Sequence, residues 1–256
     1  MSQRDKPSSS TSPNEIVPPP FHNSSTITKF HPISHTLITI TQLILSTLCL
    51  LYIPSTKLLD DPVRCLNVTT MTLFFVQFLI ESSRWLLYLQ GDGIETNKSI
   101  KAMLKNLIEH KGENFAHALW ITLFGAFMFH LIAIVFGAPA IDDVLHTMLF
   151  ALYISLLAIY PPACAFKNHG PIWARVFSDG SPESIPEKLI YYTTVATVVG
   201  AWLGAIVIPL DWDRPWQVWP IPCVIGGFVG HIVGSIISLF VCYFSGEGDN
   251  IQKKRE

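Results

Sequence analysis

Residues 221–244 read IPCVIGGFVGHIVGSIISLFVCYF, an apolar run that contains no Asp, Glu, Lys or Arg. A helix needs about 20 predominantly apolar residues to cross the hydrocarbon core of a bilayer, and this run is long enough. Five further runs of similar length precede it, at 33–53, 67–89, 115–137, 144–164 and 189–210. The sequence therefore predicts an all-α integral membrane protein, a bundle of about six transmembrane helices.

The composition excludes an ordinary soluble domain. Half of the 256 residues are hydrophobic, only 14% are charged, and the mean hydropathy is +0.39. A soluble domain carries roughly a quarter of charged residues. The net charge of −2 is too small to indicate nucleic acid or another strongly charged partner.

The predicted membrane domain covers residues 33–245 and leaves two short tails. Residues 1–32 begin with a Ser- and Pro-rich stretch that has almost nothing to bury, so we expect a disordered tail. No apolar core follows Met1, so we expect no cleavable signal peptide. Residues 246–256 form a polar tail after the last run.

The distribution of Lys and Arg predicts the orientation. Thirteen of them fall on one side of a six-span topology and three on the other, and Arg84 lies within a span. The thirteen are Arg4, Lys6, Lys29, Lys98, Lys101, Lys105, Lys111, Lys167, Arg175, Lys188, Lys253, Lys254 and Arg255, and the three are Lys57, Arg64 and Arg214. Because basic loops stay in the cytosol, both termini are predicted to be cytosolic.

The C-terminal sequence Lys253-Lys254-Arg255-Glu256 places two lysines at the third and fourth positions from the end. This resembles the dilysine signal that retrieves membrane proteins to the endoplasmic reticulum. The alternative is a solvated basic tail that only helps to set the topology. We expect retrieval, and therefore a multi-pass protein of the endoplasmic reticulum membrane.

The five cysteines follow neither a zinc pattern nor a redox pattern, and no cofactor or metal is predicted. A bridge between Cys65 and Cys223 in an oxidising lumen stays open as an alternative. Asp142, Asp143 and His146 have residue types that could ligate a metal, but the preceding Gly-Ala-Pro turn favours capping of a helix N-terminus.

Glu81 and Arg84 are the ionisable pair inside a span, where each charge costs roughly 3 kcal/mol at mid-helix. They are three residues apart and share a helix face, and Arg84 is close enough to the cytosolic end to snorkel. A structural pair is favoured over a proton or substrate site. His130 and His231 are lone histidines that we expect to hydrogen-bond between helices.

The loop after the second run has the spacing of an amphipathic helix. Its apolar positions are Ile100, Met103, Leu104, Leu107 and Ile108, and lysines surround them. Such a helix is expected either on an anionic membrane surface or packed under the bundle.

Small residues recur at every fourth position in the last two runs. They are Ala196, Gly200 and Gly204 in the fifth run and Gly226, Gly230 and Gly234 in the sixth. A stripe without side chains lets another helix backbone approach closely. We expect these two helices to pack on each other or on a helix of a partner.

Between those runs lies DWDRPWQVWP, residues 211–220, on the predicted lumenal side. Tryptophan favours membrane interfaces, so a simple aromatic belt is the alternative reading. Tryptophan with arginine is also typical of interface hot spots. We expect a rigid docking surface for a partner or a lipid headgroup, formed by Asp211, Trp212, Asp213, Arg214, Pro215, Trp216, Trp219 and Pro220.

The longer run GAWLGAIVIPLDWDRPWQVWPIP, residues 200–222, closely resembles the signature of the PIG-F family of glycosylphosphatidylinositol (GPI) anchor assembly. FGAP at 136–139 and RVFS at 175–178 support the resemblance, which extends over roughly 33–245. It implies a non-catalytic membrane subunit without a cofactor. Such a subunit binds and stabilises, as a heterodimer, an ethanolamine phosphate transferase of the PIG-O or PIG-G kind. Those transferases modify mannoses of the GPI precursor and take the group from phosphatidylethanolamine.

A stand-alone membrane enzyme or lipid transporter is the rival hypothesis. It would use Asp211, Asp213 and Arg214, with Glu81 and Arg84 deeper in the membrane, on phosphatidylethanolamine or the GPI precursor. The sequence contains neither the zinc-protease motif HExxH nor the nucleophile elbow GxSxG. We therefore favour the non-catalytic subunit and predict no catalytic residue.

Overall fold

The computed structural model describes residues 32–91, 100–167, 169–210 and 212–253, and in these ranges every regular element is a helix. The predicted tail 1–32 lies outside the described residues except for Pro32. The helices are α1 (Pro32–Leu51), α2 (Pro62–Gly91), α3 (Ile100–Val135), α4 (Val144–Ala158), α5 (Tyr160–Phe166), α6 (Gly170–Trp173), the π-helix η2 (Ala174–Ser178), α7 (Ile185–Ala205), the 3₁₀ helix η3 (Pro215–Gln217) and α8 (Ile221–Lys253). The predicted all-α class is confirmed.

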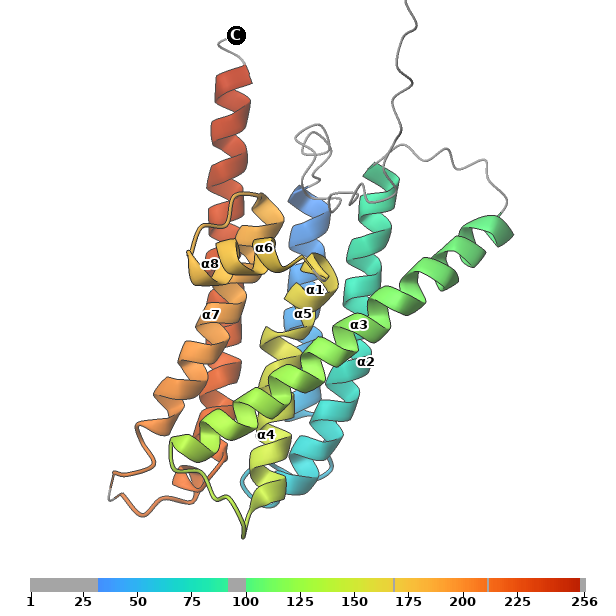
Figure 1. The fold of residues 1–256 in the computed structure, drawn as a ribbon. Coiled ribbons are helices and arrows are strands. Elements are labelled where there is room, and N and C mark those ends of the chain that lie inside the picture. The colour runs from blue at the N-terminus through green and yellow to red at the C-terminus, as the bar shows by residue number, and fades with distance from the viewer. Residues whose placement is uncertain (1–31, 92–99, 168, 211, 254–256) are drawn as a thin grey trace, which may run out of the picture.

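Among the described residues, four helices are long and apolar enough to cross a membrane, in the windows Ser34–Leu51, Pro62–Arg84, Asn114–Val135 and Ile221–Val241. A fifth span results if α4 and α5 count as one bent span. Helix α7, which covers most of the predicted run 189–210, is not among them. It nevertheless runs beside α8 through the bundle (Figure 1).

The run 144–164, predicted as one span, is two helices that meet at Ile159 with a bend of 42°. Pro161 and Pro162 cause this break, because proline lacks the N–H that would bond the carbonyl four residues earlier. The carbonyl that Pro162 leaves free is that of Ala158, and the Thr194 hydroxyl donates to it at 3.0 Å. Backbone groups in a membrane need such partners, so α7 stabilises the break in its neighbour.

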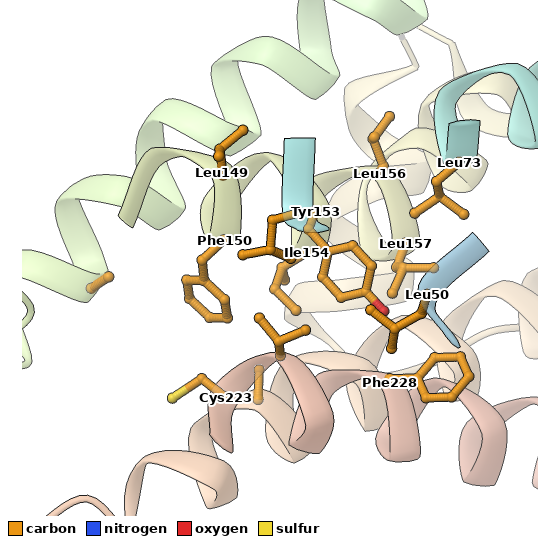
Figure 2. Close-up of a cluster of buried hydrophobic side chains, with 14 residues drawn as sticks. Leu50, Leu73, Leu149, Phe150, Tyr153, Ile154, Leu156, Leu157, Cys223 and Phe228 are labelled. Carbon is orange, nitrogen blue, oxygen red and sulfur yellow. The ribbon is translucent and has the colours of Figure 1, made fainter. Parts of the chain in front are cut away.

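The core forms around α4, whose described residues from Leu149 to Ala158 are almost all buried. Tyr153, Ile154 and Leu157 are at most 2% exposed. Figure 2 shows Tyr153 and Leu157 beside Leu50 of α1 and Phe228 of α8. Because α4 is apolar on every side and the other helices surround it, its burial organises the bundle.

Helices α7 and α8 pack backbone to backbone along the two small-residue stripes. A methyl group added at Gly200 would collide with the carbonyl of Gly226, and one added at Gly230 would collide with the carbonyl of Ala196. At Gly234 the added carbon would lie 2.6 Å from the carbonyl oxygen of Tyr192. The two stripes therefore face each other within one chain.

Helix α3 is longer than predicted and crosses the bundle obliquely (Figure 1). The segment expected as a separate amphipathic helix forms its first turns, continuous with the third span. The side chains of these turns lie outside the described part. Farther along, the Ser155 hydroxyl of α4 donates to the Thr122 carbonyl at 2.6 Å and joins α3 to the core helix.

The segment between α5 and α7 folds over the bundle end opposite the α7–α8 loop (Figure 1). Its own small core consists of Phe166, Ile172, Val176 and Ile190. Arg175, in the RVFS fragment, lies 2.9 Å from Glu187 and 3.3 Å from Glu183. These ion pairs join η2 to the start of α7.

Cys65 and Cys223 are both free thiols and both buried. The bridge that the sequence left open is therefore absent.

Candidate functional site

The loop between α7 and α8, residues 206–220, is braced from inside by Gln217, which is only 8% exposed. Its side-chain oxygen accepts from the N–H of Arg214 at 2.9 Å. Its amide nitrogen donates to the carbonyls of Val207 at 2.8 Å and Leu210 at 2.7 Å. One amide thus satisfies three backbone groups on both arms of the loop, which fixes a loop whose described regular structure is the short helix η3.

Trp219 attaches the loop to the rest of the bundle. Its indole N–H donates to the Thr147 hydroxyl at 3.1 Å, and its ring meets the ring of Phe150 edge-on at 5.1 Å. The Thr147 hydroxyl in turn donates to the carbonyl of Pro139 at 3.3 Å. A fully buried threonine therefore connects the loop to the FGAP fragment between α3 and α4.

Trp212 and Trp216 lie on the outer side of this braced loop. Their rings are 5.8 Å apart, and the residues are 53% and 36% exposed. Asp213, Arg214 and Pro215, between them, are exposed as well. Asp213 has φ of 46°, a left-handed conformation that aspartate tolerates better than most residues. The exposed edge therefore presents two aromatic rings with a carboxylate and a guanidinium between them.

The residues predicted for this site divide into two groups. Trp212, Asp213, Arg214, Pro215 and Trp216 are exposed, whereas Trp219 is half-buried and Pro220 is buried. Asp211 lies outside the described residues.

Sequence reasoning missed the two residues that hold the loop, Gln217 and Thr147. A single glutamine in a loop carries no signal of which carbonyls it will meet. Thr147 is 72 residues from its partner Trp219, and nothing in the sequence connects them.

Asp142 and Asp143 precede α4, as predicted, but the expected side-chain capping is wrong. Asp143 occupies the N-cap position and makes no side-chain cap hydrogen bond. Its carboxylate instead lies 3.2 Å from the Nδ1 atom of His146, which is one turn into the helix. This contact competes with the backbone N–H groups for the carboxylate.

Glu81 and Arg84 form an ion pair of 3.1 Å toward the other end of α2. Arg84 also donates to the side-chain oxygen of Gln42 on α1 at 2.6 Å. Gln42 donates to Gln77 at 3.2 Å, and Gln77 donates to the carbonyl of Leu156 at 3.2 Å. A continuous polar chain therefore links α1, α2 and α4 inside the bundle.

His231 is fully buried in α8, and its Nδ1 atom lies 3.3 Å from the Thr197 hydroxyl of α7. This is the interhelical hydrogen bond expected for it, and it lies between the two small-residue stripes. The histidine joins the same pair of helices that the glycines bring together.

The charged residues of the α7–α8 loop, Asp213 and Arg214, lie too far from Glu81 and Arg84 to form a single reaction centre with them. Helix α2 starts at Pro62, at the end of the bundle that carries the α7–α8 loop (Figure 1). At 1.5 Å per residue, Arg84 lies roughly 30 Å along the helix from that end. The loop therefore offers an exposed surface for contact, while Glu81 and Arg84 belong to a separate region.

Comparison with known proteins gives one family. The model of the GPI biosynthesis protein family Pig-F matches residues 40–239. The human protein named "GPI ethanolamine phosphate transferase, stabilizing subunit" is 36% identical over 189 residues, which cover 70% of this chain and 86% of the human one. The mouse protein of the same name is 33% identical over 203 residues, 74% of this chain and 93% of the mouse one.

A third relative is the Yarrowia lipolytica protein named "Glycosylphosphatidylinositol anchor biosynthesis protein 11". It is 40% identical over 113 residues, which cover 44% of this chain and 48% of the yeast protein. No solved structure matches the chain.

Proposed function

The chain belongs to the PIG-F family of GPI biosynthesis proteins, and from that membership we propose that it is a non-catalytic membrane subunit that binds and stabilises a GPI ethanolamine phosphate transferase. The names of the human and mouse relatives support this role. The partner we expect is a transferase of the PIG-O or PIG-G kind, in a heterodimer.

The observation that carries the proposal is the exposed pair Trp212 and Trp216 on a loop that Gln217 and Trp219 hold rigid. A rigid aromatic surface loses little conformational freedom when a partner covers it, which favours tight binding. Asp213 and Arg214 lie between the rings and would set the register through polar contacts. Trp219 and Pro220 contribute from beneath by holding the loop in place.

We place this surface in the lumen of the endoplasmic reticulum, in a protein of six spans with both termini in the cytosol. The asymmetry of Lys and Arg supports that orientation. The connections α1–α2, α3–α4 and α7–α8 lie together at one end of the bundle (Figure 1), as this topology requires. Labelling of single cysteines placed at Lys101 and Asp213 tests it, and a cytosolic Asp213 would contradict it.

The docking surface is tested by Trp216→Ala and Arg214→Ala, with recovery of the transferase measured in a pull-down from mild detergent. Truncation of an interface tryptophan costs about 2 kcal/mol or more, a loss of affinity of about thirtyfold. Trp120→Ala is the matched control, because Trp120 is 73% exposed on α3, away from the loop. Each variant is first shown to insert normally into the membrane.

Loss of the transferase with Trp216→Ala and not with Trp120→Ala supports docking. If the transferase is recovered normally but ethanolamine phosphate is no longer added, the loop acts in another way. It would then contact a lipid, phosphatidylethanolamine or the GPI precursor, or take part in catalysis. If neither measurement changed, the tryptophans would be an interfacial belt.

A further inference from the structure

Arg84 lines a small pocket toward the end of the bundle opposite the α7–α8 loop. The pocket lies between α1, α2, α7 and α8, next to the break between α4 and α5. Thr39, Thr193, Thr194, Ser235 and Ser238 contribute hydroxyl groups to its wall. Leu157 and Pro161 from the two sides of the break contribute apolar surface. We infer that this pocket binds the phosphate of a membrane glycerophospholipid.

The Arg84 guanidinium is permanently charged, and although Glu81 balances that charge, not all of the guanidinium N–H groups have a partner. An arginine side chain presents five N–H donors. Contacts with Glu81 and Gln42 engage two of the Arg84 donors within the described part of the chain. The Arg84 side chain is 19% exposed, and no carboxylate is among the described residues that line the pocket.

Two hydroxyls complete the donor set. Those of Thr39, Thr194 and Ser238 already donate to backbone carbonyls. Thr193 and Ser235 make no such bond among the described residues, so both hydroxyls are available to an anion. A guanidinium with two hydroxyl donors is a combination that suits phosphate oxygens.

The depth of the pocket favours a lipid as the source of that phosphate. Arg84 stands five residues before the end of the apolar run 67–89, toward the predicted cytosolic end of α2. At 1.5 Å per residue this is within about 8 Å of the end of the run, so the long side chain of Arg84 can reach the level of the headgroups. The enclosed space is only about 20 Å³, so a phosphate oxygen would enter while the rest of the lipid lies outside.

The apolar residues Leu189 and Ile190 form part of the same wall at the start of α7. They lie one turn before Thr193 and Thr194 on α7, so the pocket wall combines apolar side chains with hydroxyl donors. A wall of this kind suits a phosphate that is attached to a lipid better than a fully hydrated anion.

Native mass spectrometry of the full chain, purified in detergent, tests the site with two lipids that have identical acyl chains. We expect palmitoyl-oleoyl phosphatidylethanolamine to bind at least about tenfold more tightly than the matched diacylglycerol, which lacks the phosphate. Thr193→Leu fills the pocket without changing a charge and should abolish this preference. Ser83→Leu is the control, because Ser83 is exposed on α2 beside Arg84.

The double variant Glu81→Gln/Arg84→Gln removes both charges together, so neither remains buried without a partner, and it should also lose the preference. If this variant does not fold, Thr193→Leu decides the question alone. Equal binding of the two lipids, or a preference that persists in Thr193→Leu, overturns the inference. Displacement of the lipid by equimolar sodium phosphate would assign the pocket to free phosphate and overturn the lipid as its source.

Discussion

Replacing Gly230 by alanine should separate α7 from α8. The added methyl carbon would collide with the carbonyl oxygen of Ala196 and lie 3.0 Å from the carbonyl carbon of that residue. Gly200 on α7 is also close, with its Cα at 3.1 Å. Carbon and carbonyl oxygen ordinarily come no nearer than about 3.3 Å, so the two backbones must move apart locally by about 1 Å.

The magnitude follows from two opposing effects. Overpacking of a close contact costs about 1–3 kcal/mol. Alanine is better than glycine in a helix interior by about 1 kcal/mol, which offsets part of that cost. The difference is a net loss of up to about 2 kcal/mol, centred on about 1 kcal/mol, which corresponds to a lowering of the melting temperature by about 2–4 °C at the centre of that range on the scale of globular domains of this size.

The assay is heating of the tagged full chain in detergent followed by size-exclusion chromatography of the surviving monodisperse fraction. Gly170→Ala is the matched control, since a methyl group there would meet nothing within 4 Å. It should melt like the unchanged chain. If Gly230→Ala and Gly170→Ala had the same melting temperature, the backbone contact between α7 and α8 would not limit stability. Our reasoning about the two stripes would then be refuted.

Three further predictions concern other parts of the chain. Gln217→Leu leaves the carbonyls of Val207 and Leu210 without their donor. Transferase recovery in the pull-down should therefore fall, although Trp216 itself is not substituted. Recovery equal to that of the unchanged chain would contradict the bracing role. Burial would raise the pKa of the Glu187 carboxyl, but hydrogen bonds from Arg175 and from the N–H of Glu183 outweigh it and lower the pKa below its usual range. Because its pKa is lower in the folded state, the Glu187 carboxylate stabilises the fold above the unfolded pKa of about 4.3. This stabilisation is lost as the pH falls through the folded-state pKa. The melting temperature should therefore decline below about pH 4.3, and Glu187→Gln should make that decline shallower; an unchanged pH profile would exclude this pair as its source. Changing Lys253 and Lys254 to serine should release the chain, expressed alone, to later compartments by microscopy, and unchanged localisation would remove the support for retrieval.

The sequence already carried the helical class and the family. Apolar runs of about 20 residues satisfy the length that a bilayer demands, and no other backbone structure short of a closed barrel satisfies its own hydrogen bonds there. The run at residues 200–222 was long and unusual enough to indicate the PIG-F family, and the family match confirms it. Both depend on local order along the chain, which a sequence records directly.

The bend within 144–164 was readable in part, because Pro161 and Pro162 stand inside an apolar run. The sequence does not show which residue donates a hydrogen bond to the carbonyl that the bend leaves free. That donor is Thr194, 36 residues from Ala158. Its position beside the break depends on the packing of α7 against α4.

The α7–α8 loop shows the same difference between what the local sequence predicts and what the packing of distant helices decides. Its tryptophans, prolines and charges were visible as a composition, but composition does not say which ring faces outward. Trp219 turns inward because Thr147 and Phe150 of α4 contact it, whereas Trp212 and Trp216 contact each other and stay exposed. Local sequence fixes which residues enter the loop, and only contacts between distant helices decide which of them remain free to meet another molecule.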